Sequence, residues 1–260
     1  MPLADITGHI QVDTLDGNDT LTLALAGGDF IVAGGLIYSG GNPAASPGDK
    51  LVITGGSQGI VTYNETNAND GSIVMSNFGT VTYTGLEPIV NSGTSTDIIF
   101  NLPAGSSEMT LGDDGTINTL SRLSSSPTSF ERTDFANPTG SLTINRGNAS
   151  DTITVNALPD FNADLSIGTT AGPFAAITLS GEVTLAAGKI LSASGTNFNA
   201  LASGAVTVSG AGAINLAADN VALDASATLN AAGTVSIVPV TTGRTINLGR
   251  VDYGRQRRVE

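Results

Sequence analysis

The chain has 260 residues, of which 40% are hydrophobic and only 13% are charged, and its formal net charge is −13. It contains no cysteine, which excludes disulfides, thiolate catalysis and Cys-ligated zinc. The negative charge repels phosphate backbones and anionic lipid surfaces, so we expect neither a nucleic-acid partner nor membrane insertion. No run approaches the ~20 apolar residues of a membrane-spanning helix, and residues 1–5 lack the basic and apolar regions of a signal peptide.

Period-2 alternation of apolar residues predicts short β-strands through the first hundred or so residues. The predicted strands span residues 10–12, 20–25, 30–38, 51–54, 60–63, 72–75, 80–83 and 98–100. Clusters of Gly, Asn, Asp and Pro predict turns between them, at residues 16–19, 27–29, 40–43 and 46–49. No longer window has a helical period, so almost no helix is expected.

The chain divides into three predicted parts: a less regular β-rich segment over 1–138, regular coils over 139–250, and a basic tail over 251–260. The boundary is placed after the irregular stretch 112–140, which contains turn and loop signals. The tail carries Arg255, Arg257 and Arg258. It is interpreted as a frayed, solvated terminus or as a basic docking or cleavage segment.

The last third of the chain repeats an apolar-x-apolar pair separated by small or polar residues. The pairs are Ile177/Leu179, Val183/Leu185, Leu191/Ala193, Val206/Val208, Ile214/Leu216, Val221/Leu223, Ala227/Leu229, Val235/Ile237 and Ile246/Leu248. Several recur after just over twenty residues: Val183 to Val206, Leu191 to Ile214, Val206 to Ala227, and Ile214 to Val235.

About three strands per repeat is typical of a chain wound into a three-sided β-solenoid. The sequence therefore predicts an all-β fold, a right-handed parallel β-helix that is more regular in its C-terminal half. Because aromatic residues make up only 5% of the chain, a narrow core of Val, Ile, Leu and Ala is expected.

One motif resembles a hydrolase active site. Residues 55–59, Gly-Gly-Ser-Gln-Gly, match the G-x-S-x-G nucleophile elbow around Ser57. That motif leads from a strand into a helix, whereas here a strand is predicted to follow. A triad would need His9, the one histidine, which is predicted to be a surface or edge residue.

A calcium site is predicted at Asp16, Asn18 and Asp19. Residues 17–21 match the second half of the calcium nonapeptide G-G-x-G-x-D-x-U-x. The alternative is an Asx turn that opens a strand, because calcium needs oxygen ligands from consecutive turns. Asp113 and Asp114 are a weaker second candidate, and residues 148–155 repeat the Asp-Thr-apolar-Thr-apolar pattern of residues 19–23.

No catalytic residue is predicted. Some solenoids cleave polysaccharides with clustered acids and bases, but the acids of this chain are dispersed. Asp160 and Asp164, which flank Phe161, are interpreted as loop residues rather than an acid/base pair. Rows of outward Thr suit a strand surface, and they are too scattered for an ice-binding face.

Several phrases together resemble segments of very large bacterial surface and repeat proteins, which mix calcium-repeat-like, cadherin-like and haemagglutinin-like segments. The phrases lie at residues 27–30, 44–49, 80–89, 136–145 and 161–165. The region after 175 is similar to filamentous-haemagglutinin-type passengers, which form β-helices. The resemblance implies that the protein is secreted or lies on the cell surface. The chain is expected to be a piece of a longer secreted protein or the product of a shortened reading frame.

These observations predict a non-catalytic structural or adhesive segment of an exported bacterial cell-surface protein. Its partners would be surface glycans or neighbouring repeats of the same protein. The alternatives are a calcium-stabilised carbohydrate-binding module and a β-helix polysaccharide lyase or hydrolase.

Overall fold

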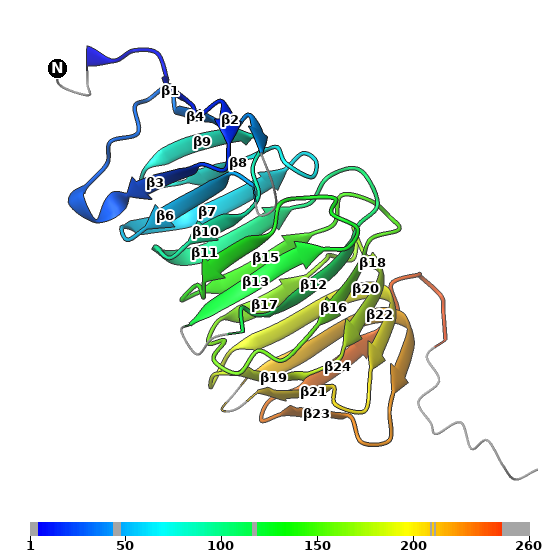
Figure 1. Cartoon of the computed structure of the whole chain (residues 1–260). Helices are drawn as coiled ribbons and strands as arrows, with labels where there is room; N and C mark the ends of the chain where they lie inside the picture. Colours follow the sequence, from blue (N-terminus) through cyan, green and yellow to red (C-terminus); the bar gives the residue numbers. More distant parts are fainter. Residues whose placement is uncertain (1–4, 44–47, 116–118, 209, 211, 246–260) are drawn as a thin grey trace, which may run out of the picture.

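The fold is mostly β. The computed structural model describes residues 5–43, 48–115, 119–208, 210 and 212–245. No described residue is α-helical, and residues Leu25–Gly27 form a short 3-10 helix, η2. Strands stack one above another from the N-terminal to the C-terminal end of an elongated body (Figure 1). The expectation of almost no helix is confirmed for this part of the chain, and no helix in it has the length and apolarity to cross a bilayer.

A 19-stranded, largely parallel sheet contains most of the strands, in two rows. Row A is the longer. In the order of their pairing, its strands are β1 (Ile10–Asp13), β4 (Leu36–Ser39), β9 (Gly79–Thr84), β8 (Gly71–Met75), β7 (Ser57–Glu65), β11 (Thr94–Asn101), β15 (Ser141–Asn145), β17 (Asp164–Ile167), β20 (Ile190–Ala200), β22 (Ala213–Leu223) and β24 (Val235–Val238).

Row B runs beside row A. Its strands are β3 (Thr20–Ala24), β6 (Lys50–Thr54), β10 (Ile89–Asn91), β14 (Thr133–Ala136), β13 (Leu120–Ser125), β12 (Glu108–Asp113), β16 (Thr152–Val155) and β18 (Phe174–Leu179), followed by the second halves of β20 and β22. Because β20 and β22 are long enough to contribute to both rows, they join the rows into one sheet.

Two small sheets complete the fold. Row C consists of β19 (Glu182–Leu185), β21 (Ala205–Val208) and β23 (Thr228–Ala231), which pair in parallel. The other small sheet joins β2 (Asp16–Gly17) to β5 (Asn42–Pro43). Rows A, B and C therefore each receive one strand or half-strand from successive passes of the C-terminal chain.

The register tests the predicted spacing of the repeats. Val183 pairs with Val206, Leu191 with Ile214, and Ile214 with Val235, so three of the predicted steps are confirmed. The fourth is wrong: Val206 pairs with Leu229 rather than Ala227. Residues 224–227 form a turn before β23, so the in-register apolar residue comes two positions later, which alternation alone could not reveal.

Antiparallel pairing occurs only at two places in the described structure. Strand β8 lies antiparallel between β7 and β9 in row A, and β13 lies antiparallel between β12 and β14 in row B. From β15 onward, all pairings with later strands are parallel. Each row thus contains one three-stranded meander in its N-terminal part.

The core lies between the rows, and it is more aromatic than expected. Alternate residues of each strand point inward, as in β15, where Leu142 and Ile144 are buried. Nine aromatic side chains are also fully buried, namely Tyr38, Tyr63, Tyr83, Phe100, Phe130, Phe135, Phe161, Phe174 and Phe198. The core is mainly Leu, Ile, Val and Ala, as expected, but most of the few aromatic residues of the chain also occupy inward positions.

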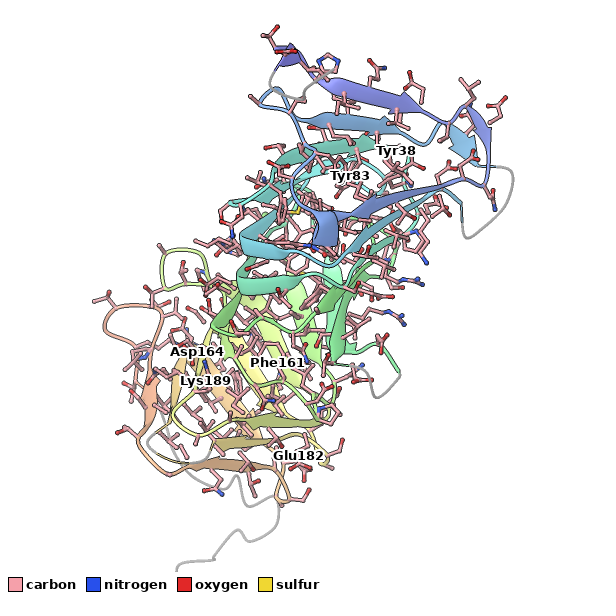
Figure 2. All side chains as sticks on the ribbon, turned by 90° about the vertical axis from the view of Figure 1, so that its left-hand side faces the viewer. Tyr38, Tyr83, Phe161, Asp164, Glu182 and Lys189 are labelled. Atoms are coloured by element: carbon pink, nitrogen blue, oxygen red, sulfur yellow. The ribbon has the colours of Figure 1, made fainter. Side chains whose placement is uncertain are left out.

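Some aromatic side chains stack from one layer to the next. Tyr63 lies on Phe100 with ring centroids 4.5 Å apart, and Phe135 lies 5.3 Å from Phe100. Figure 2 places Tyr38 and Tyr83 in the N-terminal part of the stack and Phe161 in the C-terminal part. Because Tyr63 and Phe100 lie in row A and Phe135 lies in row B, these ring contacts connect the two rows across the core.

The parallel ladders continue across residue 138. Strand β11 pairs with β15, and β12 with β16, so the same core lies on both sides of the predicted boundary. The division there stays a prediction, although both meanders precede it. The predicted basic tail lies outside the described residues.

Candidate functional site

A cavity of the described structure lies where three loops meet at one side of the stack. The loops are residues 66–70 after β7, 85–88 before β10, and 126–132 between β13 and β14. Its volume is about 390 Å³. The residues that line it are Ala68, Asn69, Glu87, Pro88, Ser124, Ser125, Thr128, Phe130, Glu131 and Arg132.

Backbone and side-chain hydrogen bonds hold these loops together. The Leu86 N–H donates to the Asn69 carbonyl at 3.0 Å, and the Ile89 N–H donates to the Arg132 carbonyl at 3.0 Å. The Asn69 Nδ2 donates to the Leu86 carbonyl and to Glu87 Oε1, both at 3.0 Å. Loops 66–70 and 85–88 are therefore tied to each other, and loop 126–132 is tied to the first residue of β10.

A buried carboxyl pair is the unusual chemical feature of this region. Glu131 lines the cavity with 3% of its surface exposed, and Glu65 is 6% exposed. Glu65 Oε2 accepts a hydrogen bond from the Tyr83 hydroxyl at 2.8 Å. Glu65 Oε1 and Glu131 Oε2 have no hydrogen-bond partner, which is rare for buried polar atoms.

Burial changes the acidity of these groups. Loss of hydration raises the pKa of Glu65 to about 7, against the opposing effect of the Tyr83 hydrogen bond. Burial, followed by repulsion from Glu65, raises the pKa of Glu131 to about 8. Burial also raises the pKa of Tyr83. Both carboxyls are therefore largely protonated below pH 7.

A glycine makes room for this arrangement. Gly71 in β8 lies opposite Glu65 in β7 and opposite Tyr83 in β9. A Cβ at position 71 would collide with the Tyr83 hydroxyl. The glycine thus allows the hydroxyl to reach the Glu65 carboxyl across the meander.

A second buried polar cluster lies next to the first. Gln58 and Asn91 exchange two side-chain hydrogen bonds, at 2.9 and 2.8 Å, and Asn91 Nδ2 also reaches the Tyr63 hydroxyl at 3.0 Å. All three side chains are buried. Because these groups satisfy one another, the amide cluster is a structural feature rather than a binding site.

Ser57 and His9, the residues considered for a hydrolase active site, both lie at the surface. Ser57 is exposed at the start of β7, and a strand follows it instead of the helix that a nucleophile elbow requires. His9 is exposed just before β1, as expected for a surface or edge residue.

The predicted calcium residues lie at the N-terminal end of the stack. Asp16 is in β2, where its Oδ1 accepts a hydrogen bond from Asn42 Nδ2 at 3.3 Å. The Asp19 N–H donates to Oδ1 of the buried Asp49 at 2.7 Å. The described residues contain no group of three or more His, Cys, Asp or Glu suited to a metal ion. Calcium at Asp16, Asn18 and Asp19 stays a prediction.

The remaining acidic candidates make structural hydrogen bonds. Asp113 Oδ1 accepts from the Gly115 N–H, in the turn that contains Asp114. Asp160 accepts from the Thr119 N–H at 3.0 Å and from Asn137 Nδ2 at 3.1 Å. Asp164 accepts from the Ile190 N–H at 2.8 Å. Asp160 and Asp164 therefore act separately, because each accepts hydrogen bonds from a different neighbouring segment.

Sequence reasoning missed Glu65 and Glu131. A signal for Glu65 is present, because it continues the inward series Val61, Tyr63 and so occupies a core position of β7. Glu131 has no such signal, because it lies in the loop between β13 and β14. The position of that loop depends on how the meander of β12, β13 and β14 folds. No protein family, no curated protein and no solved structure matches this chain.

Proposed function

We propose that the chain is a right-handed β-solenoid and a non-catalytic structural or adhesive segment of an exported bacterial cell-surface protein. The observation that carries the proposal is the continuous parallel stacking of rows A, B and C over the C-terminal passes. Such stacking builds a long body whose stability comes from neighbouring layers, which suits a spacer or a display surface.

The side chains support the same role. Asn64, Asn101 and Asn145 stack in register and form a chain of amide hydrogen bonds at 2.8 and 2.9 Å. Asn197 and Asn220 repeat this contact at 2.9 Å further along. Identical residues that bond from layer to layer stabilise an extended stack and need no ligand.

The non-catalytic part of the proposal rests on burial. Of the two carboxyls with raised pKa values, only Glu131 lines the cavity, and Glu65 is buried behind it, so the two are not both accessible to a polysaccharide as the acid and the nucleophile of a glycosidase are. Asp160 and Asp164 are each engaged by backbone N–H groups.

Surface labelling tests the location. Antibodies raised against the purified chain should label intact cells of the organism that produces it. Labelling that appears only after the cells are lysed would overturn the export part of the proposal.

A glycan array, run with and without calcium, tests the role. Binding without calcium dependence, or no binding, agrees with an adhesive or structural segment. Binding that requires calcium would replace it with a calcium-stabilised carbohydrate-binding module, and cleavage of a polysaccharide would replace it with an enzyme.

A further inference from the structure

The cavity between loops 66–70, 85–88 and 126–132 is lined by two carboxyl groups. The Glu87 and Glu131 side chains line it, and Glu65 lies close enough behind Glu131 to repel its charge. Arg132 is the cationic side chain among the lining residues, and it is 45% exposed. The lining thus contains two carboxyl groups and one guanidinium, and a third carboxyl, that of Glu65, lies behind Glu131.

One carboxyl oxygen of Glu131, which lines the cavity, lacks a hydrogen-bond partner. Glu131 Oε2 makes no hydrogen bond although Glu131 is 3% exposed, and the nearby Glu65 Oε1 is in the same state. A buried carboxylate without a partner is strongly unfavourable. A positively charged N–H donor supplies both the missing hydrogen bond and the missing charge.

The cavity geometry favours an organic cation over a bare metal ion. Metal sites need several converging oxygen ligands, and the described residues contain no such acidic group. A volume of about 390 Å³ is also far larger than one ion needs, and the hydroxyls of Ser124 and Thr128 add polar lining.

We propose that this cavity binds a small organic molecule through a protonated primary amine, which contacts the Glu131 carboxylate. Glu87 adds a second carboxylate at the wall, and Asn69 holds Glu87 in place at 3.0 Å. The proposal does not depend on where the chain is located or on whether it forms a solenoid.

Binding of a cation is linked to release of a proton. The groups that face Glu131 are Glu65 on β7, Tyr83 on β9, Glu87 before β10, and Arg132 beside it. Its pKa of about 8 means that it is mostly neutral at pH 7. An ammonium group stabilises the ionised form, so affinity should rise from pH 6 to pH 8 while the amine remains protonated.

Titration calorimetry with a matched pair of probes tests the proposal on the full chain. The probes are 5-amino-1-pentanol and 1,5-pentanediol, which differ by an amine in place of a hydroxyl, with glucose as a third ligand. We expect the amine to bind at least about ten-fold more tightly than the diol or glucose. In buffers of different ionisation enthalpy at pH 7, binding should release roughly half to one proton.

Substitutions make the test specific. Glu131→Gln keeps the shape of the side chain, and it should weaken amine binding by at least about ten-fold and abolish proton release. Glu182→Gln is the control, because Glu182 is exposed and lies at the opposite end of the stack from Tyr83 (Figure 2). It should leave affinity and proton release unchanged. Circular dichroism establishes that both variants are folded.

Several results would overturn the proposal. They are equal binding of amine and diol, tighter binding of glucose, amine binding without proton release, or an unchanged affinity in folded Glu131→Gln. Absence of amine binding at millimolar concentration by the wild-type chain at pH 8 would overturn it as well.

Discussion

At the scale of single residues, aspartates at the starts of strands hold neighbouring layers. Asp151, just before β16, has no exposed surface, and it accepts backbone hydrogen bonds from Ser107, Gly147 and Asn148 at 2.8–2.9 Å. Asp219, which lies within β22, likewise accepts hydrogen bonds from both the N–H and the hydroxyl of Thr241. The Asp-Thr-apolar-Thr-apolar pattern, read as a trace of a calcium repeat, thus has a structural use at Asp151.

Replacing Asp151 by Asn tests this use. The amide group of Asn cannot accept on both sides, so at least one buried backbone N–H loses its partner. We expect a loss of about 1.5–3 kcal/mol in the free energy of unfolding, measured by denaturant titration. The exposed Asp13→Asn variant should change it by less than about 0.5 kcal/mol. Equal effects of the two substitutions would contradict the role of Asp151.

The buried carboxyls predict an unusual dependence of stability on pH. Glu65 and Glu131 have folded-state pKa values of about 7 and about 8, above the ordinary value of 4.5. The unfolded chain therefore binds fewer protons between pH 5 and 8, and stability should fall as pH rises through this window. The decline is up to about 1.4 kcal/mol per pH unit for each carboxyl.

Comparison with neutral variants isolates these two groups. The double variant Glu65→Gln, Glu131→Gln should lose most of the decline between pH 5 and 8, as measured by urea unfolding at each pH. Glu182→Gln should retain it. A wild-type chain whose stability rises over the same window would show that the carboxyls are ionised in the folded state.

At the scale of elements, ladders of like residues connect strands that are far apart in sequence. Asn101 in β11 donates to Asn64 in β7 and accepts from Asn145 in β15. The same three residues pair in the backbone register. Each terminal Asn makes one of these amide bonds, whereas Asn101 makes two.

This asymmetry gives a graded prediction. Asn145→Ala removes one side-chain bond and should cost about 0.5–1.5 kcal/mol of unfolding free energy, whereas Asn101→Ala removes two and should cost roughly twice as much. Chemical denaturation of both variants measures the ratio. If Asn101→Ala is no more destabilising than Asn145→Ala, the ladder does not contribute as a chain of bonds.

At the scale of the whole molecule, burial decreases toward the C-terminal end of the described stack. In the interior, Leu142 and Ile144 have no exposed surface. At the end, Leu223, Val235 and Val238 are 45%, 40% and 47% exposed, and β23 has no fully buried residue. Since each layer is stabilised by its neighbours, the last layers have fewer contacts than the central ones.

Hydrogen exchange should therefore be graded along the stack. Amides of β23 and β24 should exchange much faster than those of β11 and β15, because local opening requires less free energy where fewer layers cover a strand. Mass spectrometry of peptides from the exchanging chain measures this directly. Uniform protection from β11 to β24 would mean that the stack opens only as one unit.

Sequence reasoning reached the strands and the direction of stacking in the regular part, because alternation directly encodes which side chains point inward. It recovered Val183/Val206 and Leu191/Ile214 as partners. It gave the wrong partner for Val206, which pairs with Leu229, because the number of residues between successive strands of row C differs from the predicted spacing. It also did not predict that β8 and β13 run antiparallel to their neighbours. Residues 66–70, Thr-Asn-Ala-Asn-Asp, which precede β8, are turn-forming residues like those between parallel strands, so composition does not reveal the reversal.

The candidate site was harder to predict from the sequence than the strands were. Glu65 occupies an inward position, but its environment depends on Tyr83 from another strand and on Glu131 from a loop 66 residues later. Asp160 and Asp164, which the sequence analysis interpreted as loop residues, accept hydrogen bonds from backbone N–H groups, and Asp164 is the first residue of β17.

The sequence by itself determined a β-rich chain of short alternating strands, the absence of cysteine chemistry, and most of the repeat spacing, since these depend on composition and local period alone. Only the tertiary structure decided which strands pair, where two of them reverse, and which carboxyls are removed from water. Those properties arise from contacts between residues far apart in the chain, and the protonation of a buried acid depends on the surroundings that folding creates.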